Sequence, residues 1–335
     1  MKLSIILPIY NVEKFVADCL ESLESQDLPK DEYEIICVDD GSPDESWKVI
    51  SQYQNKYSNI RLIRQENGGV CSARNNGQKA ASGDYIWFVD PDDYIQTDCL
   101  GTLMEKLYQE DADFIVFEYD KVPEESAFVV GEKTEIQIQP QVEYESRGSG
   151  CQYICKRSYL ENNDIYFNGR LAYGEDYLWA FQVNYRKHIG LTTSAVIYHY
   201  RQRSGSAMHK KSKEKKIRHR DDMHALALIY NNEYARCARE GLPKSVLSNI
   251  KKRQQLCVQG VILDIIQIAD SKMELKNALK QMRQEKLYPY RWMWWLFTDK
   301  AIDFPLKAKV FSLFFPMQWY VVLMNSFFRK RNKKG

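Results

Sequence analysis

The sequence predicts an α/β fold in which a mostly parallel sheet carries helices on both faces. Through about residue 120, apolar segments of strand length alternate with segments of helical periodicity. Acidic residues directly follow two of the apolar segments, and short polar turns separate the elements. Strands joined through helices run parallel, and their carboxyl ends form the edge where such sheets bind ligands.

The predicted elements follow one another in a regular order. Five apolar segments have the length of buried strands: 3–7, 34–38, 60–63, 85–89 and 113–117. Four segments with helical spacing or small residues predict helices: 12–23, 42–53, 70–81 and 97–108. Asn11 is expected to cap the first helix. The second is expected to begin with a capping box from Ser42 to Glu45, with Pro43 at the first helical position.

The alternating pattern ends near residue 120, which suggests two regions. We expect an α/β domain at 1–210, in which 121–150 form an irregular excursion. From residue 211 to 335 we expect a helical region. Its candidate helices are 213–240, 243–269 and 272–287.

The composition excludes some classes of protein. A formal net charge of +2, with 44% hydrophobic and 27% charged residues, is typical of an ordinary folded protein and gives no reason to expect a nucleic-acid partner. None of the eight cysteines has CxxC spacing, which favours reduced thiols. The apolar run at 3–7 breaks at Pro8 and is too short for a signal peptide, so we expect a cytoplasmic protein.

Two acidic clusters follow predicted strands and are therefore expected to converge. Asp90 and Asp92 are spaced for a hard cation such as Mg²⁺ or Mn²⁺, because closely spaced buried carboxylates need a cation or a proton. Asp39 and Asp40 could accept hydrogen bonds from a base or a ribose. The alternative for both clusters is a turn that caps the next helix.

Five motifs in this order resemble the family 2 glycosyltransferases of GT-A fold. They span 4–11, 38–42, 67–69, 72–77 and 88–93, and the resemblance covers roughly residues 1–205. It implies a nucleotide-diphosphate sugar donor, usually UDP-linked, and inversion at the anomeric carbon. Residues 1–120 would then bind the donor, whereas 121–210 would supply the acceptor side and the catalytic base.

The resemblance also implies roles for individual residues. At the nucleotide pocket it places Pro8, Tyr10, Asn11, Asp39, Asp40, Arg74, Asn75 and Asp90. Asp40 is expected to contact the uracil, with Asp39 beside it. Asp92 is expected to bind the metal, while Asp90 faces the ribose or the metal. Arg74 is expected to brace these carboxylates.

Two later segments complete the expected site. Glu175 and Asp176 resemble the family's catalytic Glu-Asp motif, in which Asp176 is the general base; the alternative is a surface acidic pair at a helix N-terminus. Arg201 and Arg203 alternate in an extended segment, so both should face one way and could bind the diphosphate. The alternative is that Arg201 and Arg203 belong to a basic strand that faces solvent and bind no ligand. His199 is expected to have a structural role rather than to bind metal.

The C-terminal end concentrates aromatic and then basic side chains. The segment 311–328 is rich in aromatic residues, and 329–334 carries five Lys and Arg residues. Its longest clean apolar run is well below the about 20 residues needed to span a bilayer. These residues favour peripheral contact with the inner face of the cell membrane. The alternative is that the aromatic segment packs on the catalytic domain.

The sequence therefore predicts a glycosyltransferase whose acceptor is a glycan or a lipid-linked molecule. A sugar nucleotidyltransferase is an alternative, but the segment after the first strand lacks a glycine-rich basic phosphate loop. No GxGxxG motif follows that strand, which disfavours a dinucleotide-dependent oxidoreductase. A catalytically silent assembly subunit is the remaining alternative, and the presence of Asp40, Asp92 and Asp176 disfavours it.

Overall fold

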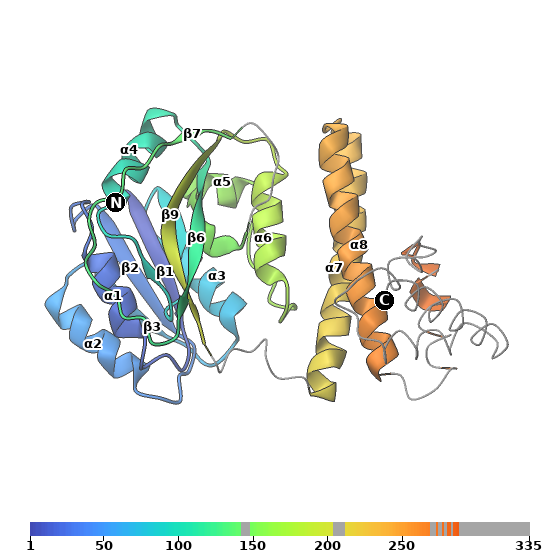
Figure 1. The fold of residues 1–335 in the computed structure, drawn as a ribbon, viewed down its shortest axis with the longest axis horizontal. Helices are drawn as coiled ribbons and strands as arrows, with labels where there is room; N and C mark the ends of the chain where they lie inside the picture. Colours follow the sequence, from blue (N-terminus) through green and yellow to red (C-terminus); the bar gives the residue numbers. More distant parts are fainter. Residues whose placement is uncertain are drawn as a thin grey trace, which may run out of the picture. The chain divides into compact units, whose positions relative to one another are not determined.

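The computed structural model describes residues 1–141, 148–203 and 212–268, with scattered positions between 273 and 287. The chain divides into two compact units, Met1–His209 and Lys210–Gly335 (Figure 1). The predicted C-terminal segment 311–328, its basic cluster and seven residues of the predicted helix 272–287 lie outside the described residues.

The first unit is built on one mixed sheet. Its strands are β1 (Leu3–Ile9), β2 (Tyr33–Asp39), β3 (Ile60–Arg64), β4 (Tyr85–Phe88), β5 (Tyr94–Ile95), β6 (Phe114–Pro123), β7 (Gln139–Pro140), β8 (Tyr153–Lys156) and β9 (Gly190–Gln202). In the described part of the chain the strand order is β3-β2-β1-β4-β8-β6-β9-β5, and β7 also pairs with β9. The predicted α/β class with a mostly parallel sheet is confirmed.

Strand directions decide where the functional loops lie. β1, β2, β3 and β4 pair in parallel. β8 runs antiparallel to both β4 and β6, and β9 is parallel to β6. β6 and β9 therefore run in the same direction as β1 to β4, and all six strands end at one edge of the sheet. This edge is called the carboxyl edge below.

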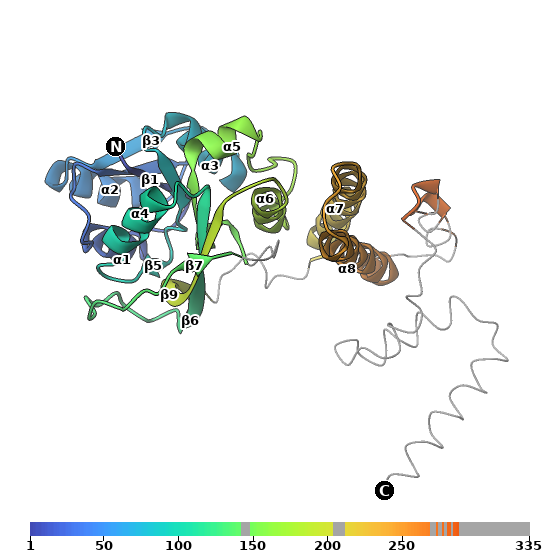
Figure 2. The same ribbon diagram turned by 90° about the horizontal axis from the view of Figure 1, so that it is seen from above.

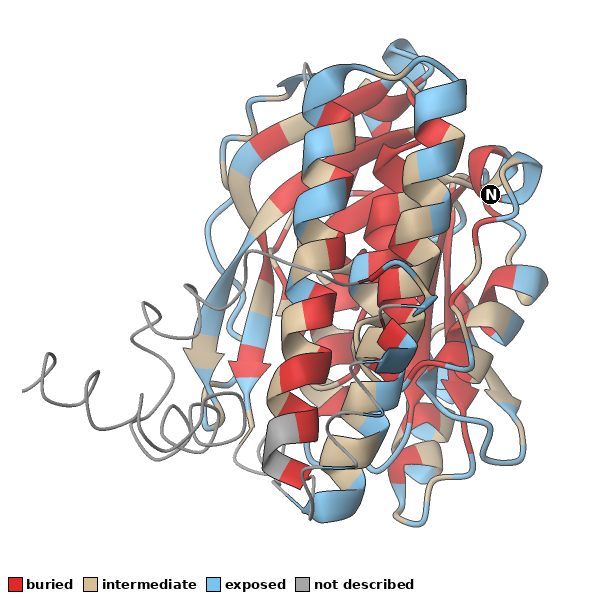
Figure 3. Ribbon diagram, turned by 90° about the vertical axis from the view of Figure 1, so that its right-hand side faces the viewer, coloured by how far each residue is buried: buried red, intermediate tan, exposed pale blue. Residues whose placement is uncertain are grey.

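Helices cover both faces of the sheet. They are α1 (Val16–Glu24), α2 (Ser46–Lys56), α3 (Val70–Ala80), α4 (Leu100–Gln109), α5 (Arg157–Asn162) and α6 (Glu175–Asn184), with a 3₁₀ turn at Gly150–Gln152. One core cluster contains side chains of α1, α2 and α4, and another contains side chains of α3, α5 and α6. Figure 2 shows these helices placed around the sheet. Along β1, Ile5 and Leu7 enter the first cluster and Ile6 enters the second, which is strand alternation. The central strands are almost entirely buried (Figure 3).

Two helices begin later than the sequence predicts. α1 begins at Val16 and α2 at Ser46, so neither Asn11 nor Ser42 caps a helix with its side chain. The reason is a cross-link between the two preceding loops: the Asp44 carboxylate accepts from the backbone N–H groups of Glu13 and Ser46. These loops stay at the carboxyl edge instead of extending the helices. The strand predicted at 113–117 is also longer than expected, since β6 continues to Pro123.

The second unit contains two long helices, α7 (Lys213–Arg239) and α8 (Lys244–Ile268), which confirm two of the predicted helices. Ser212 caps α7 by accepting from the N–H of Lys215. The helices pack side by side, and His219 Nδ1 lies 2.5 Å from Asp264 Oδ2 between them. Within the described residues, the helices are too short or too polar to cross a membrane.

Candidate active site

The two acidic clusters lie at the carboxyl edge, as the sequence predicts. Ile9 at the end of β1 is in register with Asp39 at the end of β2, and the Asp40 N–H donates to the Ile9 carbonyl at 2.9 Å. β4 pairs with the other side of β1, and Asp90 follows two residues after β4 ends. Adjacent parallel strands therefore bring the clusters to the same edge.

Asp39 and Asp40 fix the surrounding loops. The buried Asp39 carboxylate accepts from the Ser42 N–H and from Arg64 Nε, each at 3.0 Å. The Asp40 carboxylate accepts from the backbone N–H groups of Gly68 and Gly69, both at 2.8 Å. The glycine-containing loop before α3 is thus tied to the end of β2, and the predicted uracil contact of Asp40 stays a prediction.

The predicted nucleotide-pocket residues after β1 differ in exposure. Pro8 is buried within β1, whereas Tyr10 is 50% exposed and Asn11 is exposed. Asn11 has a φ of 54°, in the left-handed region that asparagine tolerates better than most residues. The chain therefore turns sharply at the carboxyl edge and leaves the Tyr10 ring accessible to a ligand.

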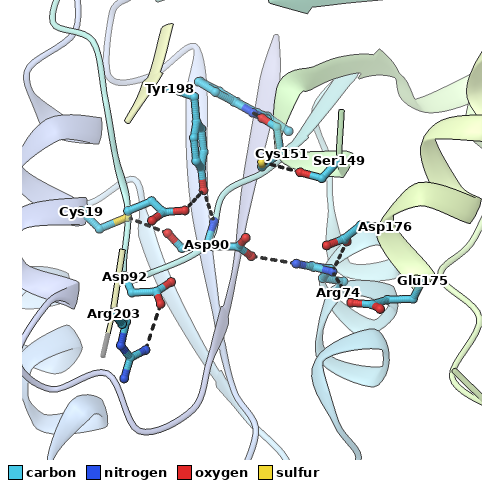
Figure 4. A network of polar contacts seen from close by, with 12 residues as sticks. Cys19, Arg74, Asp90, Asp92, Ser149, Cys151, Glu175, Asp176, Tyr198 and Arg203 are labelled. Carbon is cyan, nitrogen blue, oxygen red and sulfur yellow. Dashed lines mark hydrogen bonds and ion pairs between the residues drawn. The ribbon is translucent and has the colours of Figure 1, made fainter. Parts of the chain in front are cut away.

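Arg74 connects the turn after β4 to the candidate base. Its side chain lies on the Phe167 ring and is only 5% exposed. Nη2 donates to Asp90 at 2.7 Å, while Nη1 donates to Asp176 at 2.6 Å and lies 3.8 Å from Glu175 (Figure 4). The predicted bracing by Arg74 is confirmed for Asp90, and it extends to the Glu-Asp pair at the start of α6.

The electrostatics of this group are strongly perturbed. Burial lowers the pKa of the Arg74 guanidinium, but Asp176 and Asp90 outweigh it and hold that pKa well above its usual value. Burial raises the pKa of Asp176, and Arg74 opposes the rise. Burial and the neighbouring Asp176 raise the pKa of Glu175 to about 7. Perturbed carboxyl groups of this kind concentrate at functional sites.

The turn after β4 is fixed by β9. The Tyr198 hydroxyl donates to Asp93 at 2.6 Å and accepts from the Asp90 N–H at 3.1 Å. Asp92 instead pairs with Arg203 Nη1 at 2.9 Å. Burial and the Asp90 charge raise the pKa of Asp92, and Arg203 lowers it. The turn therefore holds more negative charge than its arginine partners offset.

Two predictions about polar residues need revision, and a third, for His199, agrees with the structure. The Arg201 side chain is 1% exposed and pairs with Asp18, so it is placed to hold β9 against α1 and not to reach a diphosphate. Both Asn75 polar groups bond the Phe167 backbone, so this side chain holds a loop and not a nucleotide. His199 pairs with Asp120, in agreement with a structural role.

The prediction that Arg201 and Arg203 face one way is confirmed, because both guanidinium groups lie over the Phe15 ring, at 5.1 and 4.7 Å. Sequence reasoning missed the contributions of Asp93, Tyr198 and Asp18. Asp93 was visible in the acidic cluster, but its partner lies 105 positions away and no local pattern indicates the pair.

The fold and the site define an α/β class of protein with carboxylates and arginines gathered at the carboxyl edge of its sheet. The fold of this chain matches the GT-A structure of Staphylococcus aureus TarS 1–349 in complex with UDP-GlcNAc, with a TM-score of 0.63, 24% identity and coverage of 86% of this chain and 88% of that one. It also matches the mannosyltransferase PcManGT from Pyrobaculum calidifontis in complex with GDP-Man and Mn²⁺, with a TM-score of 0.53, 16% identity and coverage of 93% and 85%.

The sequence comparisons give the family. The "Glycosyl transferase family 2" family model matches residues 4–164. The uncharacterized glycosyltransferase EpsJ of Bacillus subtilis is 36% identical over 184 residues, which are 52% of this chain and 53% of EpsJ. S. aureus TarS, a poly(ribitol-phosphate) beta-N-acetylglucosaminyltransferase, is 29% identical over 214 residues, or 62% of this chain and 37% of TarS. The chain therefore contains a family 2 glycosyltransferase domain at residues 4–164, and it spans about half or less of these relatives' length.

Proposed function

We propose that this protein is an inverting glycosyltransferase that moves a sugar from a nucleotide-diphosphate donor to a glycan or lipid-linked acceptor. The observation that carries the proposal is the position of Arg74 between Asp90 and Asp176. One guanidinium separates the carboxylate of the metal-binding turn from the candidate base. Leaving group and acceptor hydroxyl would therefore lie on opposite sides of one sugar carbon.

The family relatives support a UDP-linked donor. The TarS structure contains UDP-GlcNAc, and TarS is named for transfer to poly(ribitol phosphate). In this chain, the exposed Tyr10 ring is accessible for stacking on a base at the carboxyl edge. Arg203 is the better placed of the two arginines for a diphosphate, because its side chain remains 24% exposed beside Asp92. A UDP-sugar and a surface polysaccharide therefore form the proposed substrate pair.

The carboxylate turn fits a divalent metal ion. Asp92 has a raised pKa because it is half-buried beside the charge of Asp90, which a hard cation would offset. Among the described residues, no group of three or more His, Cys, Asp or Glu side chains is arranged to hold an ion. Asp92, with Asp90 beside it, would thus hold Mg²⁺ or Mn²⁺ together with donor phosphates and water. The ion would neutralise charge on the diphosphate leaving group.

Asp176 is the proposed general base. Its carboxylate would accept the proton of the acceptor hydroxyl while that oxygen attacks the anomeric carbon and the bond to the diphosphate breaks. The ion pair with Arg74 favours the ionised form against the cost of burial, so the carboxylate stays able to accept a proton. Attack from the side opposite the leaving group inverts the anomeric configuration.

Two substitutions separate chemistry from binding. Asp176→Asn should leave UDP affinity near wild type and lower turnover by roughly 10²-fold or more. Asp92→Asn should instead abolish the gain in UDP affinity that Mn²⁺ gives the wild type. Titration calorimetry with UDP, and UDP release from a panel of nucleotide sugars, measure both effects.

Asp111→Asn is the matched control, because Asp111 pairs with Lys156 and its side chain is 84% exposed. It should change neither quantity. Full turnover in the Asp176 variant would exclude this residue as the base. Equal UDP affinity of the wild type with and without divalent metal would exclude metal-assisted donor binding.

A further inference from the structure

An exposed pair of aromatic rings lies beside the carboxylate turn. Tyr119 on β6 and Tyr200 on β9 have ring centroids 6.3 Å apart and ring planes at 80° to each other. Tyr119 is 40% exposed and Tyr200 is 37% exposed, which is unusual for two large neighbouring rings on the inner strands of a sheet. These two residues are called the tyrosine pair below.

The strand register places the tyrosine pair on the same side as the site. Tyr119 is the register partner of Tyr198, whose hydroxyl bonds Asp93 and the Asp90 N–H. Tyr200 follows two residues later, so it projects from the same face of β9. The alternate residue His199 pairs with Asp120 on the opposite face. The tyrosine pair therefore continues the active-site surface along the carboxyl edge.

Electrostatics agree with this position. Burial raises the pKa of the Tyr200 hydroxyl, and the charges of Asp93, Asp92 and Asp90 raise it further. These three carboxylates do not attract an anionic occupant to the tyrosine pair, where Lys121 is the register partner of Tyr200. A neutral occupant with polarised C–H groups suits the negative faces of aromatic rings. A sugar ring, with an apolar face and hydroxyls on its rim, has this chemistry.

We propose that Tyr119 and Tyr200 form the acceptor subsite, where one ring stacks on a pyranose of the acceptor glycan and the other contacts its edge. This inference rests on the proposed function, since it names where the acceptor sugar is held. The acceptor would then present a sugar ring to the tyrosine pair. An open-chain polyol phosphate does not fit the subsite.

A matched set of variants tests the subsite. The probes are octyl β-glycosides of glucose, galactose and N-acetylglucosamine, with ribitol 5-phosphate as the open-chain comparison, each added in the presence of UDP and Mn²⁺. Saturation-transfer NMR titrations measure their affinities. Tyr119→Ala and Tyr200→Ala should each weaken glycoside binding about tenfold, or about 1.4 kcal/mol. Tyr200→Phe should retain binding, because the aromatic face remains.

The control is Tyr108→Ala. Tyr108 is 41% exposed and forms a similar perpendicular pair with Tyr85, with centroids 5.4 Å apart. It contacts Asp84, which precedes β4 at the opposite edge of the sheet. This variant should bind the glycosides as the wild type does, and a comparable loss would make the effect non-specific.

Calorimetry with UDP separates this inference from the proposed function. If UDP binds and the alanine variants bind the glycosides as tightly as the wild type, the subsite assignment is wrong. It is also wrong if no glycoside binds, or if only ribitol 5-phosphate binds. If the wild type fails to bind any nucleotide of the panel, the proposed function itself fails.

Discussion

Replacing Arg74 with methionine should have a large effect on stability that depends on pH. Methionine keeps much of the apolar stem on the Phe167 ring, but it removes the positive charge from between Asp90, Glu175 and Asp176. Their side chains are 26%, 14% and 26% exposed, so water can offset only part of the loss. Removing one partner of a buried ion pair typically costs about 3–5 kcal/mol, and we expect this range at pH 8.

The deficit should shrink in acid. Burial already raises the pKa of Asp176, and the pKa of Glu175 is about 7. Without the guanidinium, both carboxyl groups would hold their protons to still higher pH in the folded state. A raised folded-state pKa means that the folded protein binds more protons than the unfolded chain, so stability falls as pH rises through this interval. The variant should therefore regain stability between pH 8 and pH 5.

Urea unfolding of wild type and variant at both pH values measures these free energies. Arg61→Met is the matched control, because Arg61 is 47% exposed and lies 3.7 Å from Glu34. An exposed pair of this kind contributes about 0–1 kcal/mol, so the control should lose little. An Arg74→Met deficit below about 1 kcal/mol, or one that grows in acid, would refute the idea that Arg74 neutralises the buried carboxylates.

The remaining predictions concern a charge, a close contact and the C-terminal end. Glu175→Gln should raise the free energy of unfolding by about 1–3 kcal/mol at pH 8 and change it little at pH 4, as measured by urea unfolding. The reason is that Glu175 ionises at an unfavourable site as pH rises through about 7, whereas the amide stays neutral. Gly77→Ala should lower the free energy of unfolding by about 1–3 kcal/mol in the same urea assay, since a Cβ there would lie 2.3 Å from Ile6 Cγ2. Gly169→Ala, with open space around it, should be tolerated. Deleting 308–335, which lie outside the described residues, should release the protein from anionic liposomes and leave UDP binding intact. If the full chain does not float with the liposomes and the truncated protein is less stable, the segment packs on the catalytic domain instead.

The sheet and its carboxyl edge were predictable because their signals are local. The apolar runs alternate with helical periodicity, and each acidic pair follows its own strand, so topology alone brings Asp39 and Asp90 to one edge. The helix starts were less predictable. The Ser42 segment has the composition of a capping box, but the bond from Glu13 to Asp44 holds that loop outside the helix.

Side-chain partners across the site could not be predicted from spacing. Arg201 and Arg203 look equivalent in the sequence, and only the packing of α1 against β9 gives Arg201 the buried partner Asp18. Asn75 follows Arg74 directly, yet it bonds the Phe167 backbone 92 positions away. The arginine that joins the two halves of the site was expected from the family resemblance, but its contact with Asp176 depends on how α6 packs against α3.

The bonds from β9 to the turn after β4 have a consequence for the order of folding. Asp93 receives its two hydrogen bonds from Tyr198 and from the Arg201 N–H, which lie 105 and 108 positions later in the chain. Contacts of such long sequence separation form slowly because a large loop must close first. On a ribosome, the strands β1 to β4 would emerge well before β9. The nascent chain could thus form its first parallel strands early, but the turn after β4 would become fixed only after residue 202 had joined the sheet.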